Sequence, residues 1–170
     1  MELVFPTIEY KQAALDYRQE HFDCGETEIH GDGGLDHAET YEGWLAKIRD
    51  ARTWEANEER VPATTYFGML NGRIVGTIQI RHELNQRLLS TYGHIGYGVR
   101  TSERRKGYAA AMLATALGKC RELGIKNVLI SCDKDNIGSA KTILKNGGVY
   151  DKDYIEENGN IVQQYWIALY

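Results

Sequence analysis

The spacing of hydrophobic residues changes several times along the chain, and each change predicts a different element. Apolar residues three and four positions apart predict helices at 8–21, at 38–51, from 107 to the glycine at 124, and at 136–145. Shorter apolar runs predict strands at 3–5, 64–70, 73–80, 94–100, 127–132 and 161–169. Asn71-Gly72 and Asn158-Gly159 predict two tight hairpins, and a loop is expected at 25–36, where four glycines occur.

The order of these elements predicts an α/β fold of α+β character, with one mixed β-sheet flanked by helices. The helix after residue 107 joins the strand at 94–100 to the continuously apolar strand at 127–132. A strand–helix–strand unit of this kind favours a right-handed crossover, so we expect a central parallel strand pair. The 170 residues are expected to form a single domain with antiparallel hairpins on both sides of that pair.

The composition of the chain is typical of a globular protein without membrane spans. The chain is 42% hydrophobic and 26% charged, and no segment has the length of a membrane span, so we expect no membrane partner. The first residues have neither a basic region nor a long apolar run, and the three cysteines are widely spread. These features predict reduced thiols and a cytoplasmic location, and no metal site.

Charge is distributed unevenly along the chain. The formal net charge is −4, which argues against nucleic-acid binding. Between residues 16 and 42 Arg18 is the only lysine or arginine, whereas nine residues there are acidic: Asp16, Glu20, Asp23, Glu26, Glu28, Asp32, Asp36, Glu39 and Glu42. This stretch is either a solvated acidic surface or the rim of a site for a cationic ligand, and the first interpretation is favoured.

Four cations and a glycine stand where the predicted strand at 94–100 gives way to the helix after it. They are Arg100, Arg104, Arg105, Lys106 and Gly107. A helix N-terminus presents free N–H groups and a partial positive charge, and a glycine lets an anion approach the backbone. The segment is therefore predicted to bind a pyrophosphate.

The same segment resembles the signature of the GNAT superfamily of acetyl-CoA-dependent N-acyltransferases, Gln/Arg-x-x-Gly-x-Gly/Ala. Arg104-Arg-Lys-Gly107-Tyr-Ala109 matches that signature, and Asn136-Ile-Gly-Ser139 resembles the family's second cofactor-contacting helix. The resemblance covers about the last hundred residues. It implies an acetyl-CoA-binding core at 63–170 and a two-helix region at 1–62 on the side of the acceptor.

The resemblance also implies roles for individual residues. Those expected to bind acetyl-CoA are Val99, Arg100, Arg104, Arg105, Lys106, Gly107, Tyr108, Ala109, Asn136 and Ser139. Pantetheine is expected to pair beside a bulged strand in which Gly96 and Gly98 provide room, and a backbone N–H near Tyr97 to Val99 is expected to polarise the thioester carbonyl. His82, His94 and Tyr97 are the catalytic candidates, with Glu83 as a further option.

One position departs from the family. Many members carry a tyrosine seven residues after the motif asparagine as the acid for the leaving thiolate, and this chain has Ile143 there. Another residue, or water, must then take that role.

Two functional interpretations remain open from these residues. The first is transfer of an acetyl group from acetyl-CoA to a primary amine of a small molecule or peptide, by direct attack in a ternary complex. The acidic stretch suggests a cationic amine, and the resemblance suggests a homodimer. The second is a non-catalytic acyl-CoA sensor. A Rossmann or P-loop nucleotide enzyme is disfavoured, because Gly96-x-Gly98-x-x-Thr101 lacks the third glycine and no Gly-Lys-Ser/Thr loop occurs.

Overall fold

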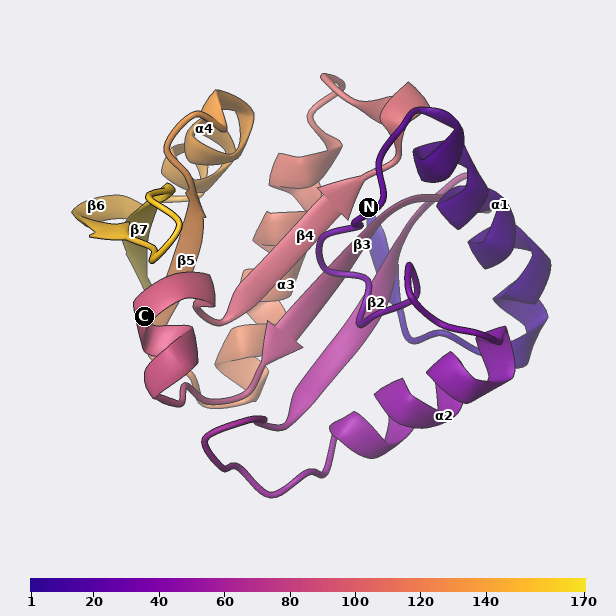
Figure 1. Cartoon of the computed structure of the whole chain (residues 1–170), viewed down its shortest axis with the longest axis horizontal. Coiled ribbons are helices and arrows are strands. Elements are labelled where there is room, and N and C mark those ends of the chain that lie inside the picture. Colours follow the sequence, from indigo (N-terminus) through magenta and orange to yellow (C-terminus); the bar gives the residue numbers. More distant parts are fainter.

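A computed structural model describes all residues from 1 to 170 (Figure 1). Its helices are α1 (Lys11–Asp23), α2 (Tyr41–Ala51), α3 (Tyr108–Glu122) and α4 (Ile137–Lys145). Its strands are β1 (Glu2–Val4), β2 (Ala63–Leu70), β3 (Arg73–Arg81), β4 (Ile95–Val99), β5 (Asn127–Asp133), β6 (Val149–Ile155) and β7 (Ile161–Ala168). Each predicted helix and strand is present, with ends shifted by a few residues. A π-helical turn at Leu88–Tyr92 has no counterpart in the sequence-based prediction.

The first four strands form one antiparallel sheet in the order β1-β2-β3-β4. The hairpin between β2 and β3 turns at Asn71 and Gly72, whose φ angles are 50° and 76°. Two positive φ angles are what a type I′ turn requires, and the Asn-Gly dipeptide adopts them at low cost. The hairpin predicted at this dipeptide is confirmed.

Helices cover both faces of this sheet (Figure 1). On one face, α1 and α2 enclose a cluster that includes Tyr17, Trp44 and Phe67, all buried. On the other face, α3 places Met112 and Leu113 against Ile78. The predicted apolar faces of α2 and α3 are buried as expected, because helical spacing brings those side chains onto one stripe.

The last three strands form a second antiparallel sheet in the order β5-β7-β6. The expected parallel ladder between β4 and β5 is not formed. The two strands meet only at a bridge between Gly93 and Ile130, where the His94 N–H donates to the Leu129 carbonyl at 2.7 Å. A strand–helix–strand order indicates how the chain crosses over, but it does not show whether the strand edges meet along their length.

None of the helices combines the length and apolar character needed to cross a membrane.

Candidate active site

The segment between β4 and α3 leaves a row of backbone amides without partners. Arg105 and Gly107 have φ angles of 61° and 83°, so the chain turns sharply before the helix begins. The first helical bond runs from the Ala111 amide to the Gly107 carbonyl, and no side chain caps the helix. The amides of residues 105–110 make no hydrogen bond within the protein. Free amides at a helix N-terminus are the feature on which the predicted pyrophosphate site depends.

The predicted cations of this segment divide into two groups. The side chains of Arg104 and Arg105 line a cavity of about 780 Å³ that we call the helix cavity, bordered by the end of β4 and the starts of α3 and α4. Those of Arg100 and Lys106 do not line it. Two lysines of α4 that the sequence analysis did not select, Lys141 and Lys145, do. They stand one helical turn apart and have no carboxylate within 4.0 Å.

Arg100 is part of a buried network instead. Its Nε donates to Glu20 Oε2 at 2.6 Å, and its Nη1 donates to the Ile74 carbonyl at 3.1 Å. Glu20 also accepts from the Thr101 hydroxyl and the Ser102 amide, each at 2.9 Å. Burial raises the pKa of Glu20, but the hydrogen bonds from Ser102, Arg100 and Thr101 outweigh it and lower that pKa to about 2. Glu20 therefore fixes the start of the segment on α1.

This network predicts a specific dependence of stability on pH. Because the pKa of Glu20 is lower in the folded state, the carboxylate stabilises the fold above its unfolded pKa, and this contribution is lost as the pH falls toward 2. We expect Glu20→Gln to lower the Tm by about 3–6 °C at pH 7, as for the loss of charge-assisted hydrogen bonds. The difference from the wild type should shrink between pH 5 and pH 2. Thermal unfolding measured across this range, with the exposed Glu9→Gln as control, checks the prediction; a pH-independent difference would contradict it.

One edge of β4 is open toward the helix cavity. β4 pairs with β3 in a single register from Gly76↔Val99 to Ile80↔Ile95. The Arg100 amide donates to the Val75 carbonyl, and antiparallel hydrogen bonding alternates, so the amides of Gly96 and Gly98 face β3. The backbone groups of Tyr97 and Val99 point outward. The Val99 carbonyl accepts from Arg104 Nε at 3.1 Å.

Glycines within a strand indicate a bulge or the close approach of another backbone, and the two glycines of β4 serve the second purpose. The pairing of β4 with β3 shows no bulge. Instead, residues 30 and 31 of the loop lie directly on β4: a Cβ on Gly31 would stand 2.4 Å from the Gly96 carbonyl, and one on Gly98 would stand 2.8 Å from the His30 carbonyl. Thr77 secures the contact by donating to the His30 carbonyl at 3.1 Å. Only glycines permit so close an approach of two backbones.

The loop at 25–36 forms one wall of a second cavity of about 830 Å³, which we call the loop cavity. Its walls come from the loop, α2, β3, β5 and the turn between β6 and β7. Five residues line both cavities, and we call them the junction residues: Glu28, His30, Tyr97, Asn136 and Ser139. The two cavities are therefore adjacent beside the middle of β4.

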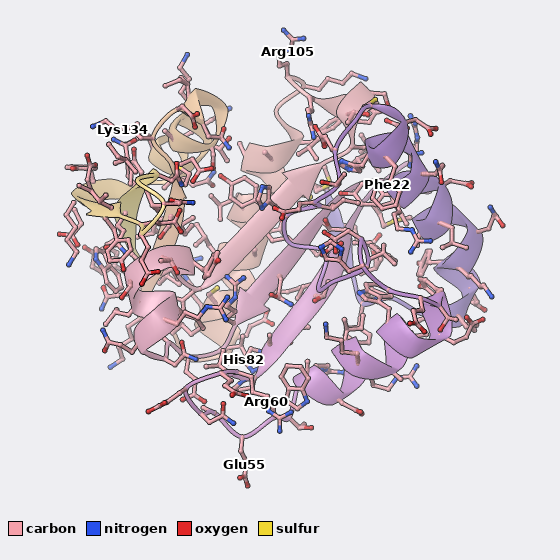
Figure 2. The ribbon with its side chains drawn as sticks, viewed as in Figure 1. Phe22, Glu55, Arg60, His82, Arg105 and Lys134 are labelled. Atoms are coloured by element: carbon pink, nitrogen blue, oxygen red, sulfur yellow. The ribbon has the colours of Figure 1, made fainter.

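Three of the predicted catalytic residues lie outside both cavities. His82 is half-buried and its Nε2 is 2.8 Å from Thr64 Oγ1, at the opposite end of the sheet from Arg105 (Figure 2). His94 is buried, and its Nδ1 accepts from the Leu129 amide at 3.0 Å, which joins β4 to β5. Burial and the charge of Arg81 lower the pKa of His94 to about 4, so it is neutral at pH 7. Glu83 is exposed on the surface.

Tyr97 is the predicted catalytic residue that reaches the junction. Its hydroxyl lies 2.6 Å from Ser139 Oγ. Burial raises the pKa of Tyr97 to about 12, so the hydroxyl keeps its proton at neutral pH. Asn136, meanwhile, caps α4 by accepting from the Ser139 amide at 3.1 Å, and Ile143 is fully buried in the core. The hydroxyl groups at the junction thus come from Tyr97 and Ser139.

Much of the acidic stretch is engaged within the protein. Besides Glu20, the Glu26 carboxylate binds Arg104 through both oxygens and also meets His21 Nδ1 at 2.7 Å. The hydrogen bonds from Arg104 are the main reason that the pKa of Glu26 falls to about 2. The Asp32 carboxylate accepts hydrogen bonds from the backbone amides of Gly34 and Asp36. Of Asp23, Glu26 and Glu28, only Glu28 lines both cavities.

His30, an exposed residue that lines both cavities, was not among the predicted site residues. The signal that identifies it is a pair of glycine clusters, one at 31–34 and one at 96 and 98, which pack together in the fold. No group of three or more His, Cys, Asp or Glu side chains is placed to hold a metal ion.

Comparisons with known proteins agree with this architecture. The family model described as "Acetyltransferase (GNAT) family" matches residues 33–147, more than half of the chain. A search of the curated proteins gave no match.

Several solved structures share the fold at low sequence identity. The microcin self-immunity acetyltransferase MccE, solved with acetyl-CoA and AMP, is 17% identical, with a TM-score of 0.67 over 98% of this chain and 91% of its own. RimJ of Mycobacterium smegmatis, solved with CoA-disulfide, is 18% identical, with a TM-score of 0.71 over 98% and 80%. An acetyltransferase of Salmonella typhimurium that modifies the N-terminal serine of a ribosomal subunit protein is 15% identical, with a TM-score of 0.66 over 99% and 94%.

Proposed function

Because this chain belongs to the GNAT acetyltransferase family, we propose that it transfers an acetyl group from acetyl-CoA to a primary amine. The acceptor is a small molecule or a peptide, and attack occurs directly in a ternary complex. The observation that carries the proposal is the meeting of two cavities at the open edge of β4. One cavity has the features of a coenzyme site, and the other provides space for a second substrate.

The helix cavity suits the coenzyme. Six consecutive amides at 105–110, together with Arg105, Lys141 and Lys145, supply donors and positive charge for the phosphates of CoA. The outward amide of Val99 and the outward backbone groups of Tyr97 offer an extended pantetheine arm a strand edge to pair with. In this pose the Tyr97 or Val99 amide donates to the thioester carbonyl and stabilises the charge that develops on its oxygen.

The junction residues would handle the protons. His30 takes a proton from the attacking amine as the new C–N bond forms, and the C–S bond breaks in the same addition–elimination sequence. Tyr97 donates a hydrogen bond to the leaving sulfur. With a pKa of about 12, Tyr97 stabilises the thiolate without having to lose its own proton, and the thiol is completed by a proton from solvent.

An activity screen tests the proposal. Thiol release from acetyl-CoA should be amine-dependent for at least one class in a panel of amino acids, amino-acid amides, polyamines and short peptides. The acylated amine should appear in equal amount by mass spectrometry. Tight acetyl-CoA binding with no turnover on any amine would favour the non-catalytic sensor instead.

A histidine comparison tests the proposed base. We expect His30→Gln to lower kcat/KM for the amine about 100-fold, the lower end of the usual contribution of general-base catalysis. The loss should be greatest near neutral pH and smaller at high pH, where the amine is already deprotonated. His82→Gln should stay within about twofold, since His82 lies outside both cavities. Equal losses in the two variants would rule out the assignment of His30. The measurement is kcat/KM as a function of pH.

A further inference from the structure

The loop cavity contains three cations that have no ionic partner in the protein. They are Lys47 of α2, Arg81 at the end of β3, and Arg87 in the segment that follows β3. No carboxylate lies within 4.0 Å of any of their side-chain nitrogens. By contrast, Arg73, Arg100 and Arg104 each bind a glutamate. Carboxylates also line this cavity, but those of Asp32, Asp133 and Glu156 accept hydrogen bonds within the protein. Cations without such partners in a concave site attract a negatively charged group.

Arg81 is the best placed of the three. Its Nη1 donates to the Gly93 carbonyl at 3.1 Å, and its guanidinium carbon stands 5.9 Å from the centre of the Tyr92 ring. These contacts hold the side chain but occupy only one of its N–H donors. Burial lowers the pKa of Arg81 to about 10, so the group keeps its charge at pH 7. A fixed guanidinium with free donors is suited to a carboxylate or phosphate.

A second donor lies beside it. Arg81 Nη2 and the backbone nitrogen of Gly31 are each 3.7 Å from the position that a Cβ on Gly96 would take. The Gly31 amide makes no hydrogen bond within the protein. Two donors without acceptors therefore stand next to one small space on the surface of β4. Ser131, which also lines the loop cavity, has a buried Oγ without a hydrogen-bond partner.

This position is close to the junction. Gly96 is two residues before Gly98, which meets the His30 backbone on the same face of β4, and two residues of a strand span about 6.6 Å. His30 and Glu28, two of the junction residues, suit the amine end of an acceptor. The loop cavity thus has unpaired cations in its lining together with a histidine and a carboxylate of the junction.

We propose that the acceptor is a small zwitterion: an amine that also carries an anionic group, which the Arg81 guanidinium and the Gly31 amide bind. The inference rests on the proposed acetyl transfer and names its acceptor class. It replaces the cationic amine suggested by the acidic stretch, because Glu20, Glu26 and Asp32 of that stretch are bound within the protein. Carboxylate and phosphate share the required chemistry, and the experiment separates them.

The experiment compares acceptors that differ in the anionic group alone. Glycine is paired with glycinamide, phenylalanine with phenylalaninamide, and O-phosphoethanolamine with ethanolamine, each with acetyl-CoA. We expect at least one anionic member to exceed its neutral partner about tenfold in kcat/KM, as for a charge-assisted hydrogen bond. Preference within the amino-acid pairs would identify a carboxylate, and preference within the ethanolamine pair a phosphate. Neutral members that match or exceed their partners would overturn the inference while leaving acetyl transfer intact.

The Arg81 variant links any preference to this site. We expect Arg81→Gln to lower kcat/KM for the preferred anionic acceptor about tenfold and to leave its neutral partner within about twofold. The acetyl-CoA KM should not change. Arg121→Gln, an exposed arginine of α3 that lines neither cavity, is the matched control. A preference that survives in Arg81→Gln would overturn the assignment.

A binding measurement covers the case in which no amine is acetylated. That result would refute the proposed function by itself. Calorimetric titration of the CoA-saturated protein with N-acetylglycine and with N-acetylglycinamide then decides the inference. Binding of the acid alone, lost in Arg81→Gln, supports the anion site, whereas equal binding or none refutes it.

Discussion

Replacing Gly107 by asparagine is expected to weaken acetyl-CoA binding about 30-fold, equivalent to about 2 kcal/mol. Gly107 has a φ of 83° and nothing within 4 Å of the position of a Cβ. Asparagine adopts left-handed conformations at low cost, so the backbone is retained and the new atoms enter the helix cavity. They would occupy the space that a phosphate needs beside the free amides. The Kd of acetyl-CoA, measured by calorimetry, checks the prediction.

Gly118→Asn is the matched control for this variant. Gly118 lies on the same helix, also with open space at its Cβ position, but it does not line the helix cavity. We expect its acetyl-CoA affinity to stay within about twofold of the wild type, the range of most surface substitutions. Unchanged affinity in Gly107→Asn would mean that the phosphates bind elsewhere.

Tyr97→Phe is expected to reduce kcat about 100-fold, the loss typical of removing one well-placed hydrogen-bond donor from a transition state. The ring remains, so packing against the core is preserved, while the hydroxyl beside Ser139 is lost. Because the hydroxyl is proposed to act on the leaving sulfur, the KM for the acceptor should change little. Steady-state thiol release with a saturating amine provides the measurement.

Two further variants separate this role from a structural one. Ser139→Ala keeps the Tyr97 hydroxyl but removes its 2.6 Å partner, so we expect a smaller fall in kcat of about tenfold. Tyr154→Phe removes a hydroxyl from the exposed strand β6 and should leave kcat unchanged. A Tyr97→Phe enzyme with wild-type kcat and normal folding would show that the hydroxyl takes no part in the reaction.

Local sequence patterns predicted the elements of this fold well. Tyr41, Trp44 and Ile48 recur at helical spacing, and all are buried on one face of α2. Local patterns could not predict whether β4 and β5 form a ladder of hydrogen bonds. Strand pairing depends on how two edges lie along their whole length in the folded chain, and here they meet only at the bridge between Gly93 and Ile130. Leu144 shows a similar limit: it follows the apolar pattern of α4 but is exposed, because no element covers that side.

The sequence predicted those parts of the candidate site in which charged side chains and free backbone amides come from neighbouring residues. Arg105, Gly107 and the free amides after them lie where the motif indicated. Individual side chains were harder, because a cation and its partner are far apart in sequence: Arg100 is 80 residues from Glu20, and the contact removes it from the cavity. His30 was missed for the same reason, since the loop that carries it meets β4 only in the folded chain.

The central claim is that a coenzyme and an amine meet beside the open edge of β4. A crystal structure of the protein with acetyl-CoA tests it most directly. We predict the pyrophosphate on the amides of 105–110, the pantetheine along Val99 and Tyr97, and the thioester within reach of the Tyr97 hydroxyl and the His30 ring. Coenzyme bound away from the helix cavity, or an acetyl group remote from the junction residues, would contradict the account.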